Sequence, residues 1–390
     1  MPSDIQVTNI KANDGTAGLV IADSTGAVTV SGDLVPSTPL SHRNMVINGA
    51  MNVAQRGTSS TSTEYQTVDR SKWIWSRVAC TQSQLALTSG DPFDLGFRYA
   101  YRIANTSTST ATDGYTLFRH FLEAQDLVSS GWNFKSTSSY ITLSFWVRSS
   151  LAGTYYCGFR SIDGTEYLYL KAFTLVADTW LKVTMTTPGN SNLTIDNNNG
   201  AGMEIVISSQ YGTDYTGGGE VTSESWYTRG GQSDAYFANY AQAWMNTASA
   251  TFDVTGVQLE LGSSATPFEH RSYAEELLRC ARYFVDVINK DQRYDFGCIG
   301  FNSGTTRIRF MVPLNVPLRD TPTVVSAGTL YSWSADGEEQ FSSPTVTGSQ
   351  AIGGTALLME KTGVSVTTPG SSGQVAGETA GAYLWLDAEL

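Results

Sequence analysis

Charged residues are scarce in this 390-residue sequence, and those present are mostly acidic. Asp, Glu, Lys and Arg together make up 15% of the chain, and the formal net charge is −12. Because few cations are available to neutralise phosphates, this balance argues against a nucleic-acid partner. Disordered chains combine low hydrophobicity with high charge, whereas 41% of the residues here are hydrophobic. The chain is therefore expected to fold.

Cysteine and histidine are also rare. The three histidines are scattered, and no two cysteines have the C-x-x-C spacing of zinc or thioredoxin-type sites. We expect free and mostly buried thiols, which fits assembly in a reducing cytoplasm. The cysteines are Cys80, Cys157, Cys280 and Cys298.

Long apolar runs are missing as well. No stretch approaches the ~18 consecutive apolar residues of a transmembrane helix, so no membrane span is expected. The first residues lack the basic and apolar regions of a secretion signal. If the protein reaches a cell exterior, we therefore expect it to do so by lysis or as part of a particle.

What the sequence does contain is the pattern of an all-β protein, with abundant Thr, Tyr, Val and Gly. Many short alternating segments separated by polar, glycine-rich loops predict a β-sandwich. We interpret 140–148 and 154–160 as a hairpin around Gly153, and 44–49 as a strand that ends in a turn. Further strands are predicted at 167–175, 180–185, 203–207 and 250–261.

Two smaller β regions flank this sandwich. Residues 1–40 contain a few short strands that cannot bury a core alone, so they are expected to associate with copies of themselves or with a docking partner. One helix is predicted at 271–284, because Ser272 and Glu275 have the spacing of a capping box and apolar residues recur at helical intervals. Residues 285–390 alternate again, notably at 306–313 and 382–390.

Two segments carry a resemblance to a known family. The sequence NMVINGAMNVAQRGT at 44–58, followed by Tyr65, Val68-Asp69-Arg70 and Trp73, resembles the opening of bacteriophage tail-fibre and minor tail proteins. FDVTGVQLELG at 252–262, ATPFEHR at 265–271 and RCARYF at 279–284 resemble the closing part of that family. Together the segments bracket about 60% of the chain, and their ordered combination is fairly specific to phage structural proteins.

The resemblance implies a fold and a cofactor to test. The block between the two segments is similar to carbohydrate-binding-module jelly rolls, some of which hold a structural calcium ion. In those modules an acidic residue of the first strand and an aspartate of the last bind the ion. Here the first-strand position is Met51 or Asn52, neither of which has a carboxylate. No cofactor is predicted, and calcium stays an open alternative.

Enzyme chemistry finds little support. Cleavage of a sugar bond needs two carboxylates flanking it, but the residue two before Glu260 is Gln258. Glu220, Glu224, Asp163 and Glu166 are interpreted as solvated loop charges. The G-x-S-x-G, P-loop and dinucleotide motifs do not occur. A non-enzymatic protein is expected.

Two aromatic segments are candidate contacts for a glycan receptor. Aromatic faces stack on sugar rings, and polar groups orient the hydroxyls. In each segment ordinary packing is the alternative, and packing is also expected for Trp73, Trp146 and Trp244. The candidates are Trp226, Tyr227, Arg229 and Asp234 in one glycine-rich loop, and Tyr331 and Trp333 beside a C-terminal turn.

These observations together predict an all-β virion protein with four regions: an attachment or trimerisation region (1–40), a jelly roll (41–270), a connecting helix (271–284) and a C-terminal β domain (285–390), the last a candidate receptor-binding tip. The expected function is a homotrimeric phage tail fibre, located in the virion tail. Its expected partners are other virion proteins at the N-terminal region and a host-surface glycan. A capsid decoration or head-fibre protein and a polysaccharide-degrading spike are the alternatives.

Overall fold

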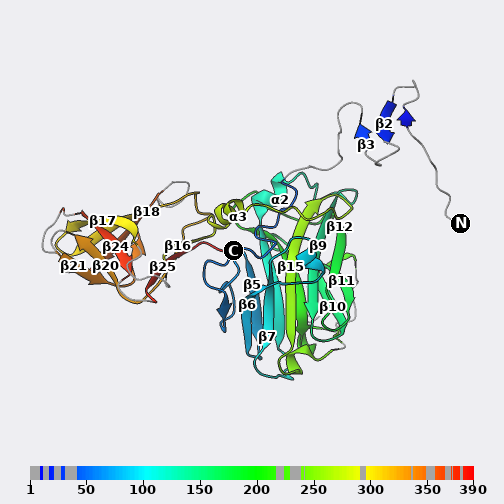
Figure 1. The fold of residues 1–390 in the computed structure, drawn as a ribbon, viewed down its shortest axis with the longest axis horizontal. Helices are drawn as coiled ribbons and strands as arrows, with labels where there is room; N and C mark the ends of the chain where they lie inside the picture. The colour runs from blue at the N-terminus through cyan, green and yellow to red at the C-terminus, as the bar shows by residue number, and fades with distance from the viewer. Residues whose placement is uncertain are drawn as a thin grey trace. The chain divides into compact units, whose positions relative to one another are not determined.

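A computed structural model shows a protein built mainly from β-strands (Figure 1). In the part of the chain that it describes, no helix is long and apolar enough to cross a membrane. The described residues are 9–11, 17–21, 28–30, 42–216, 224–228, 239–240, 242–289, 296–334, 337–347, 356–364, 370, 372–377 and 381–390.

The chain divides into two compact units, Met1–Arg43 and Asn44–Leu390. The described part of the first unit is an antiparallel three-stranded sheet in the order β1-β2-β3. Its strands are β1 (Asn9–Lys11), β2 (Ala17–Ile21) and β3 (Val28–Val30). Short strands were expected in this region, and these three confirm them.

The second unit contains the predicted sandwich, made of two six-stranded antiparallel sheets. Neighbouring strands often come from distant parts of the sequence, which is the crossover pattern of a jelly roll. The first sheet has the order β14 (Trp226–Thr228), β11 (Tyr167–Leu175), β10 (Gly153–Ser161), β13 (Ala201–Tyr211), β8 (Tyr115–Glu123), β5 (Ser71–Ser76). The second has the order β12 (Leu181–Pro188), β9 (Tyr140–Ser149), β15 (Thr251–Leu261), β7 (Tyr99–Asn105), β6 (Cys80–Ala86), β4 (Ser59–Ser60). Short helical segments lie at α1 (Asp91–Asp94), α2 (Ala124–Ser129), η1 (Thr213–Tyr215) and η3 (Trp244–Asn246).

The main hydrophobic core lies between the two sheets. Alternate side chains of each strand point into it, as the period-2 pattern predicts. Trp73 and Trp244 are completely buried there, which confirms two of the three tryptophans expected in the core. Trp146 is half-buried on the outer side of the second sheet. All four cysteines are buried and free.

The predicted hairpin around Gly153 is wrong. β9 pairs with β12 and β15, whereas β10 pairs with β11 and β13, so the two strands lie in different sheets. The connecting segment crosses from one layer to the other, and Tyr155 at its end donates from its hydroxyl to the Leu151 carbonyl at 2.9 Å. Alternation detects a strand but not its partner, so it cannot separate a hairpin from a crossover.

The predicted strand at the start of 44–49 is wrong, whereas the turn predicted at its end is present over 47–50. Asn48 and Met51 both have φ of 59°, a conformation that does not continue a strand. The Asn44 side chain takes the place of strand pairing against β15: its amide donates to Val257 O at 3.1 Å and its carbonyl accepts from Leu259 N at 3.0 Å. Two backbone bonds, from Met45 N to Leu259 O and from Val257 N to Gly49 O, both at 2.9 Å, complete the attachment of the motif to the last strand of the sandwich.

The connecting helix is shorter than predicted. α3 runs from Tyr273 to Cys280, with Ser272 Oγ accepting from Glu275 N at 3.2 Å, as the capping box predicts. Phe284 instead begins a strand, because its backbone pairs with Asp387. Cys280 and Glu276 are buried on this helix, whereas Leu278 is exposed. Glu276 is held there by Asn48 N and by Arg271.

The C-terminal region confirms the second predicted β domain, with a curled seven-stranded sheet and a three-stranded sheet. Its core is separate from that of the sandwich. The three-stranded sheet has the order β16 (Phe284–Ile288), β25 (Tyr383–Asp387), β19 (Thr323–Ala327). The larger sheet has the order β21 (Gly337–Phe341), β20 (Leu330–Ser334), β24 (Ser372–Gly377), β17 (Phe296–Gly304), β18 (Arg307–Pro313), β23 (Ala356–Thr362), β22 (Thr345–Val346).

Buried charges fasten the end of the chain to the sandwich. Arg56 contacts Asp69 at 3.2 Å and Asp387 at 3.1 Å, and Arg70 pairs with Glu389. The guanidinium of Arg70 also lies 3.5 Å from the centre of the Tyr283 ring. Because Arg56, Asp69 and Arg70 belong to the family-like opening segment, that segment has a structural role in joining the two β domains.

Candidate binding groove on the outer face of the first sheet

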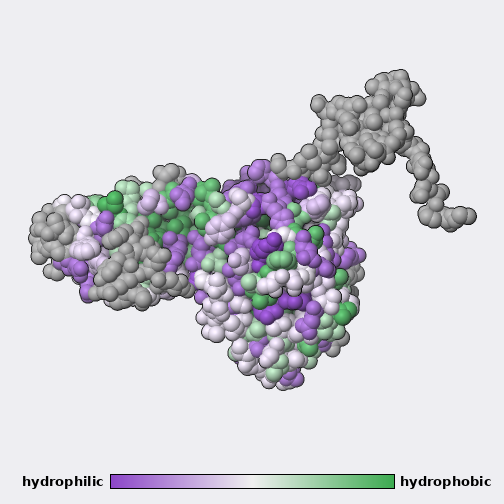
Figure 2. Space-filling model, viewed as in Figure 1, coloured by the Kyte–Doolittle hydropathy of each residue, from purple (hydrophilic) through white to green (hydrophobic). Residues whose placement is uncertain are grey.

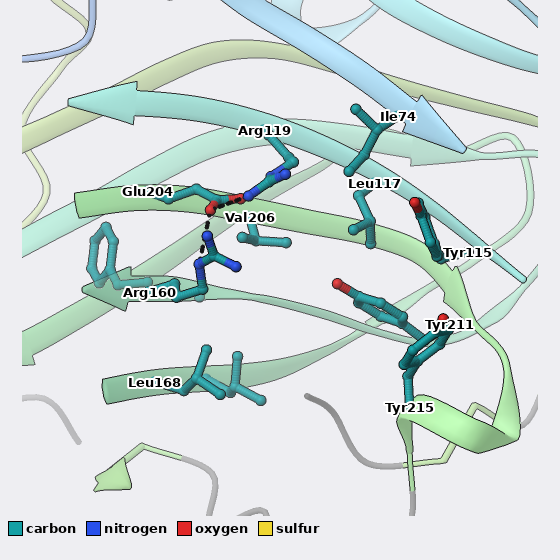
Figure 3. Close-up of a pocket in the computed structure, with 13 residues that line it drawn as sticks. Ile74, Tyr115, Leu117, Arg119, Arg160, Leu168, Glu204, Val206, Tyr211 and Tyr215 are labelled. Carbon is teal, nitrogen blue, oxygen red and sulfur yellow. Dashed lines mark hydrogen bonds and ion pairs between the residues drawn. The ribbon is translucent and has the colours of Figure 1, made fainter. Parts of the chain in front are cut away.

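A groove of about 310 Å³ lies on the outer face of the first sheet (Figure 3). Side chains from β5, β8, β13, β10 and β11 line it, because each strand alternates and half of its residues point away from the core. The floor is apolar and includes Ile74, Leu117, Leu168, Leu170 and Val206.

Three tyrosines line one end of the groove. The ring centres of Tyr115 and Tyr211 are 6.0 Å apart, and that of Tyr215 is 6.0 Å from the first and 5.7 Å from the second. Tyr115 begins β8, Tyr211 ends β13, and Tyr215 follows in the helical turn η1. Rings that are apolar on their faces and polar at their hydroxyls suit a ligand with both kinds of surface.

Two arginines and a glutamate line the other part of the groove. Glu204 on β13 lies between Arg119 on β8 and Arg160 on β10 (Figure 3). Both arginines pair with its carboxylate, and Arg160 Nε lies 3.1 Å from Oε2. The Glu204 side chain is 1% exposed, whereas those of Arg119 and Arg160 are 17% and 22% exposed. The guanidinium groups therefore reach the solvent and the carboxylate does not.

Burial and the carboxylate act in opposite directions on Arg119. Burial lowers the pKa of its guanidinium, but the hydrogen bond and charge of Glu204 outweigh burial and raise the pKa. The arginine is thus a permanently charged donor fixed in one place. Its N–H groups can donate to ligand oxygens without first being ordered.

A glycine keeps the middle of the groove open. Gly158 lies on β10 at an outward position, two residues before Arg160. A Cβ there would lie 2.3 Å from Tyr169 O and 2.5 Å from Leu170 Cδ2, so no larger residue fits without moving strand β11. The absence of a side chain leaves the floor low between the tyrosines and the arginines.

The structure separates the residues of the predicted glycan-binding loop. Trp226 faces the sandwich core: its indole N–H donates to Pro188 O at 2.7 Å, and its ring centre lies 5.3 Å from that of Tyr169. Packing, the alternative weighed for this residue, is therefore what the structure shows. Tyr227 points the other way, pairs in register with the groove residue Leu168, and packs on the outer face. Arg229 and Asp234 lie outside the described residues.

The C-terminal candidates also differ from each other. Tyr331 is 1% exposed, which agrees with the packing alternative, and its contact with a receptor stays a prediction. Trp333 is 47% exposed and lies on the same strand, β20. Other exposed apolar residues occur on β17 and β18 of the same seven-stranded sheet, and hydrophobic patches are visible on this region and on the sandwich (Figure 2).

The residues do not fit the calcium site of the resembling modules. The last-strand aspartate, Asp253, accepts from Arg102 at 2.7 Å and from Arg148 at 2.7 Å, so guanidinium groups occupy its oxygens. Among the described residues, no group of three His, Cys, Asp or Glu side chains is placed to hold a metal ion. The guanidinium groups of Arg102 and Arg148 would also repel a calcium ion beside Asp253.

Sequence reasoning missed the groove because it judged each strand by its buried face. In Tyr115-Thr-Leu117-Phe-Arg119 every second residue points outward, and Glu204-Ile-Val206 has the same alternation. An outward row of tyrosine, leucine and arginine is unusual for a solvated sheet face. That row was a detectable signal, but its partners on β10 and β11 could only come from the sheet order.

Comparison with known proteins gives fold-level likeness only. No family model and no curated protein matches the sequence. Among solved structures, the sandwich is similar to carbohydrate-binding modules and to a phage tailspike domain. A family 4 module has 11% identity and a TM-score of 0.29, over 56% of this chain and 99% of the module. A family 11 module from Clostridium thermocellum, in complex with a β-1,3-1,4-mixed-linked tetrasaccharide, has 15% identity and a TM-score of 0.25, over 55% and 98%.

The similarity to a phage protein covers only a small part of that protein. The enzymatically active domain of tailspike protein 4 from bacteriophage CBA120 has 12% identity and a TM-score of 0.29, over 56% of this chain. This chain spans 21% of that tailspike's length. TM-scores and identities this low allow no transfer of function from these proteins to this chain. Any function must be inferred from the groove itself.

Proposed function

We propose that this protein is a phage tail-fibre subunit that binds glycans of the host surface through the groove of the first sheet. The observation that carries the proposal is the pairing, in one open groove, of three clustered tyrosines with the solvent-accessible guanidinium groups of Arg119 and Arg160. Aromatic faces cover the C–H faces of sugar rings, and fixed N–H donors bond their hydroxyls.

The shape of the groove supports an extended ligand rather than a compact one. It runs across strands from β5 to β11, and both its ends are lined by side chains that combine apolar and polar surface. A volume of about 310 Å³ is at the low end for ligand pockets, which is enough for one or two sugar units in contact at a time. Binding at a single groove is therefore expected to be weak.

Weak single contacts suit a multivalent particle. We propose a homotrimer because the described residues of the first unit form three short strands, too few to bury a core alone. Three linked grooves on one fibre raise the overall affinity without any new contact. In this proposal the first unit trimerises the chain or attaches it to other virion proteins, and the tail location is inferred from the family-like segments.

We also propose that the groove binds without cleaving. Both carboxylate oxygens of Glu204 are engaged by guanidinium groups, which leaves neither oxygen in a position to serve a sugar bond. Glycoside hydrolysis uses one carboxyl group to protonate the leaving oxygen and a second to assist attack. Glu204 instead orients the two arginines.

The test is a binding screen of the purified full chain on host envelope polysaccharides and oligosaccharides, with reducing-sugar release measured on the same samples. The proposal expects retention on at least one glycan and no release of reducing ends. Absence of binding to every host glycan would overturn it. Release of reducing ends would replace it with the polysaccharide-degrading spike.

A further inference from the structure

A second pocket, of about 470 Å³, lies on the outer face of the other sheet of the sandwich. Because the core lies between the sheets, this pocket and the groove are on opposite sides of the domain. Its walls come from β9, β12 and the segment that follows β15. The proposed binding of glycans in the groove does not depend on this pocket.

Aromatic rings form one wall of this pocket. The ring centres of Phe97 and Phe268 are 4.8 Å apart, and that of His270 is 5.0 Å from the first and 4.9 Å from the second. Phe97 is 2% exposed and forms the base, whereas Phe268 is half-buried and His270 is exposed. The three rings hold one another in place.

A glycine brings a fourth ring into the pocket. Gly256 has φ of 62°, at the irregularity where β15 changes its register with β9. A Cβ there would lie 2.7 Å from Phe97 and 3.2 Å from Trp146. Because glycine has no Cβ, both rings can lie against the strand and face the same space.

The polar part of this pocket is cationic. Lys182 on β12 lies directly opposite Trp146 in the ladder with β9, so the two side chains are neighbours on the outer face. No ion pair of Lys182 is found in the part of the chain that the structure describes. No Asp or Glu is among the described residues that line the pocket. The pocket therefore has a positive local charge, although the chain as a whole has a net charge of −12.

Asp94, Glu260 and Glu269 lie near the lining residues in sequence, and none of them lines the pocket. Asp94 precedes Leu95 and is exposed on α1. Glu260 accepts from Thr266 N at 2.8 Å, and Glu269 accepts from Asn44 N at 2.9 Å and from Arg271 at 3.0 Å. Both are thus bound to other groups of the sandwich. A ligand in the pocket meets aromatic faces and an ammonium group, which together suit a sugar ring that carries a negative charge.

We propose that this second pocket binds a carboxylate-bearing sugar, with its ring against Trp146 and Phe268 and its carboxylate near the Lys182 ammonium group. The groove has its own two cations, but both pair with Glu204 and Arg160 also lies 3.9 Å from Glu166, so two carboxylates balance them. The second pocket contains Lys182 without a carboxylate in its lining. The two sites therefore select different sugars, neutral in the groove and acidic in the second pocket.

The experiment is ligand-observed NMR titration of the full chain, at low salt because screening weakens exposed charge pairs. The probes are the methyl glycosides of glucuronic acid, galacturonic acid and N-acetylneuraminic acid. Their neutral counterparts are methyl glucoside, methyl galactoside and the carboxamide of the N-acetylneuraminic acid glycoside. The proposal expects at least one acid to bind. Its neutral counterpart, and the acid with the Lys182→Gln variant, should bind about 5-fold more weakly, as loss of one partly exposed ion pair implies.

Three variants locate the site. Phe268→Ala should also weaken binding of the acid, whereas Lys171→Gln, a lysine on the other sheet paired with Glu224 at 2.8 Å, and Tyr211→Ala in the groove should leave it within about twofold of the wild type. Thermal melting establishes that each variant is folded. The proposal is overturned by absence of binding to all three acids, by unchanged binding with Lys182→Gln, or by loss with Tyr211→Ala, which would move the acid to the groove.

Discussion

The Arg119–Glu204–Arg160 cluster gives the sharpest quantitative prediction. Glu204→Gln keeps the size of the side chain but removes the charge between two guanidinium groups. Breaking a buried ion pair by removal of one partner costs about 3–5 kcal/mol, because the other charge stays buried. Here the arginines keep 17% and 22% of their side-chain exposure, so water solvates them in part. We therefore expect a loss of about 2–3 kcal/mol in the free energy of unfolding.

The assay is urea unfolding followed by tryptophan fluorescence, since urea does not screen charges as guanidinium chloride does. Glu275→Gln is the matched control, because Glu275 makes a 3.0 Å pair with Arg279 on the surface of α3, where both side chains are more than 30% exposed. An exposed helix pair of this kind contributes less than about 0.5 kcal/mol. If Glu204→Gln destabilises the protein no more than the control does, the cluster is not a rigid arginine support and the groove argument loses its basis.

Two further predictions concern stability. Glu389→Gln removes the partner of Arg70, whose side chain is 1% exposed, and should lower the free energy of unfolding by about 3 kcal/mol in the same assay; a change under 0.5 kcal/mol would show that the chain end is not fastened by this pair. His120 is buried beside Ser71 Oγ at 3.1 Å, and burial, then the charge of Arg70, lowers its pKa well below the usual value. Because the unfolded chain then takes up a proton that the folded chain does not, stability should fall as pH falls below about 6.5, by about 1.4 kcal/mol per pH unit. His120→Gln should remove that contribution, so the difference between wild type and variant should vary with pH below 6.5 and be constant above it.

How much the sequence predicted depends on the range of the interaction. Alternation of apolar and polar residues was enough to locate β9, β11, β13 and β15, because the buried face of a strand depends on that strand's own residues. It failed for β9 and β10 as a pair, since sheet membership depends on distant partners. Helical spacing of apolar residues failed at Phe284, because this residue pairs with Asp387 in a sheet and does not continue the helix.

The candidate site shows the same limit. Tyr227 was singled out for its aromatic character and does lie on the groove side of its strand, but its neighbour Trp226 faces the core. Adjacent residues of a strand face opposite sides of the sheet, so aromatic residues that are neighbours in the sequence need not form one cluster in the structure. Arg119, Glu204 and Arg160 come from three strands, and only the sheet order brings them together.

The most direct test of the proposed function is the affinity of groove variants for the oligosaccharide that the binding screen selects. Isothermal titration compares the wild type with Tyr215→Ala in the groove, with Tyr273→Ala on the exposed side of α3, and with Trp333→Ala in the C-terminal domain. Loss of one stacking ring should weaken binding by about tenfold. The account predicts that loss for Tyr215→Ala and affinities within twofold of the wild type for the other two. Full affinity of Tyr215→Ala together with loss in Trp333→Ala would contradict it and place the glycan on the C-terminal domain.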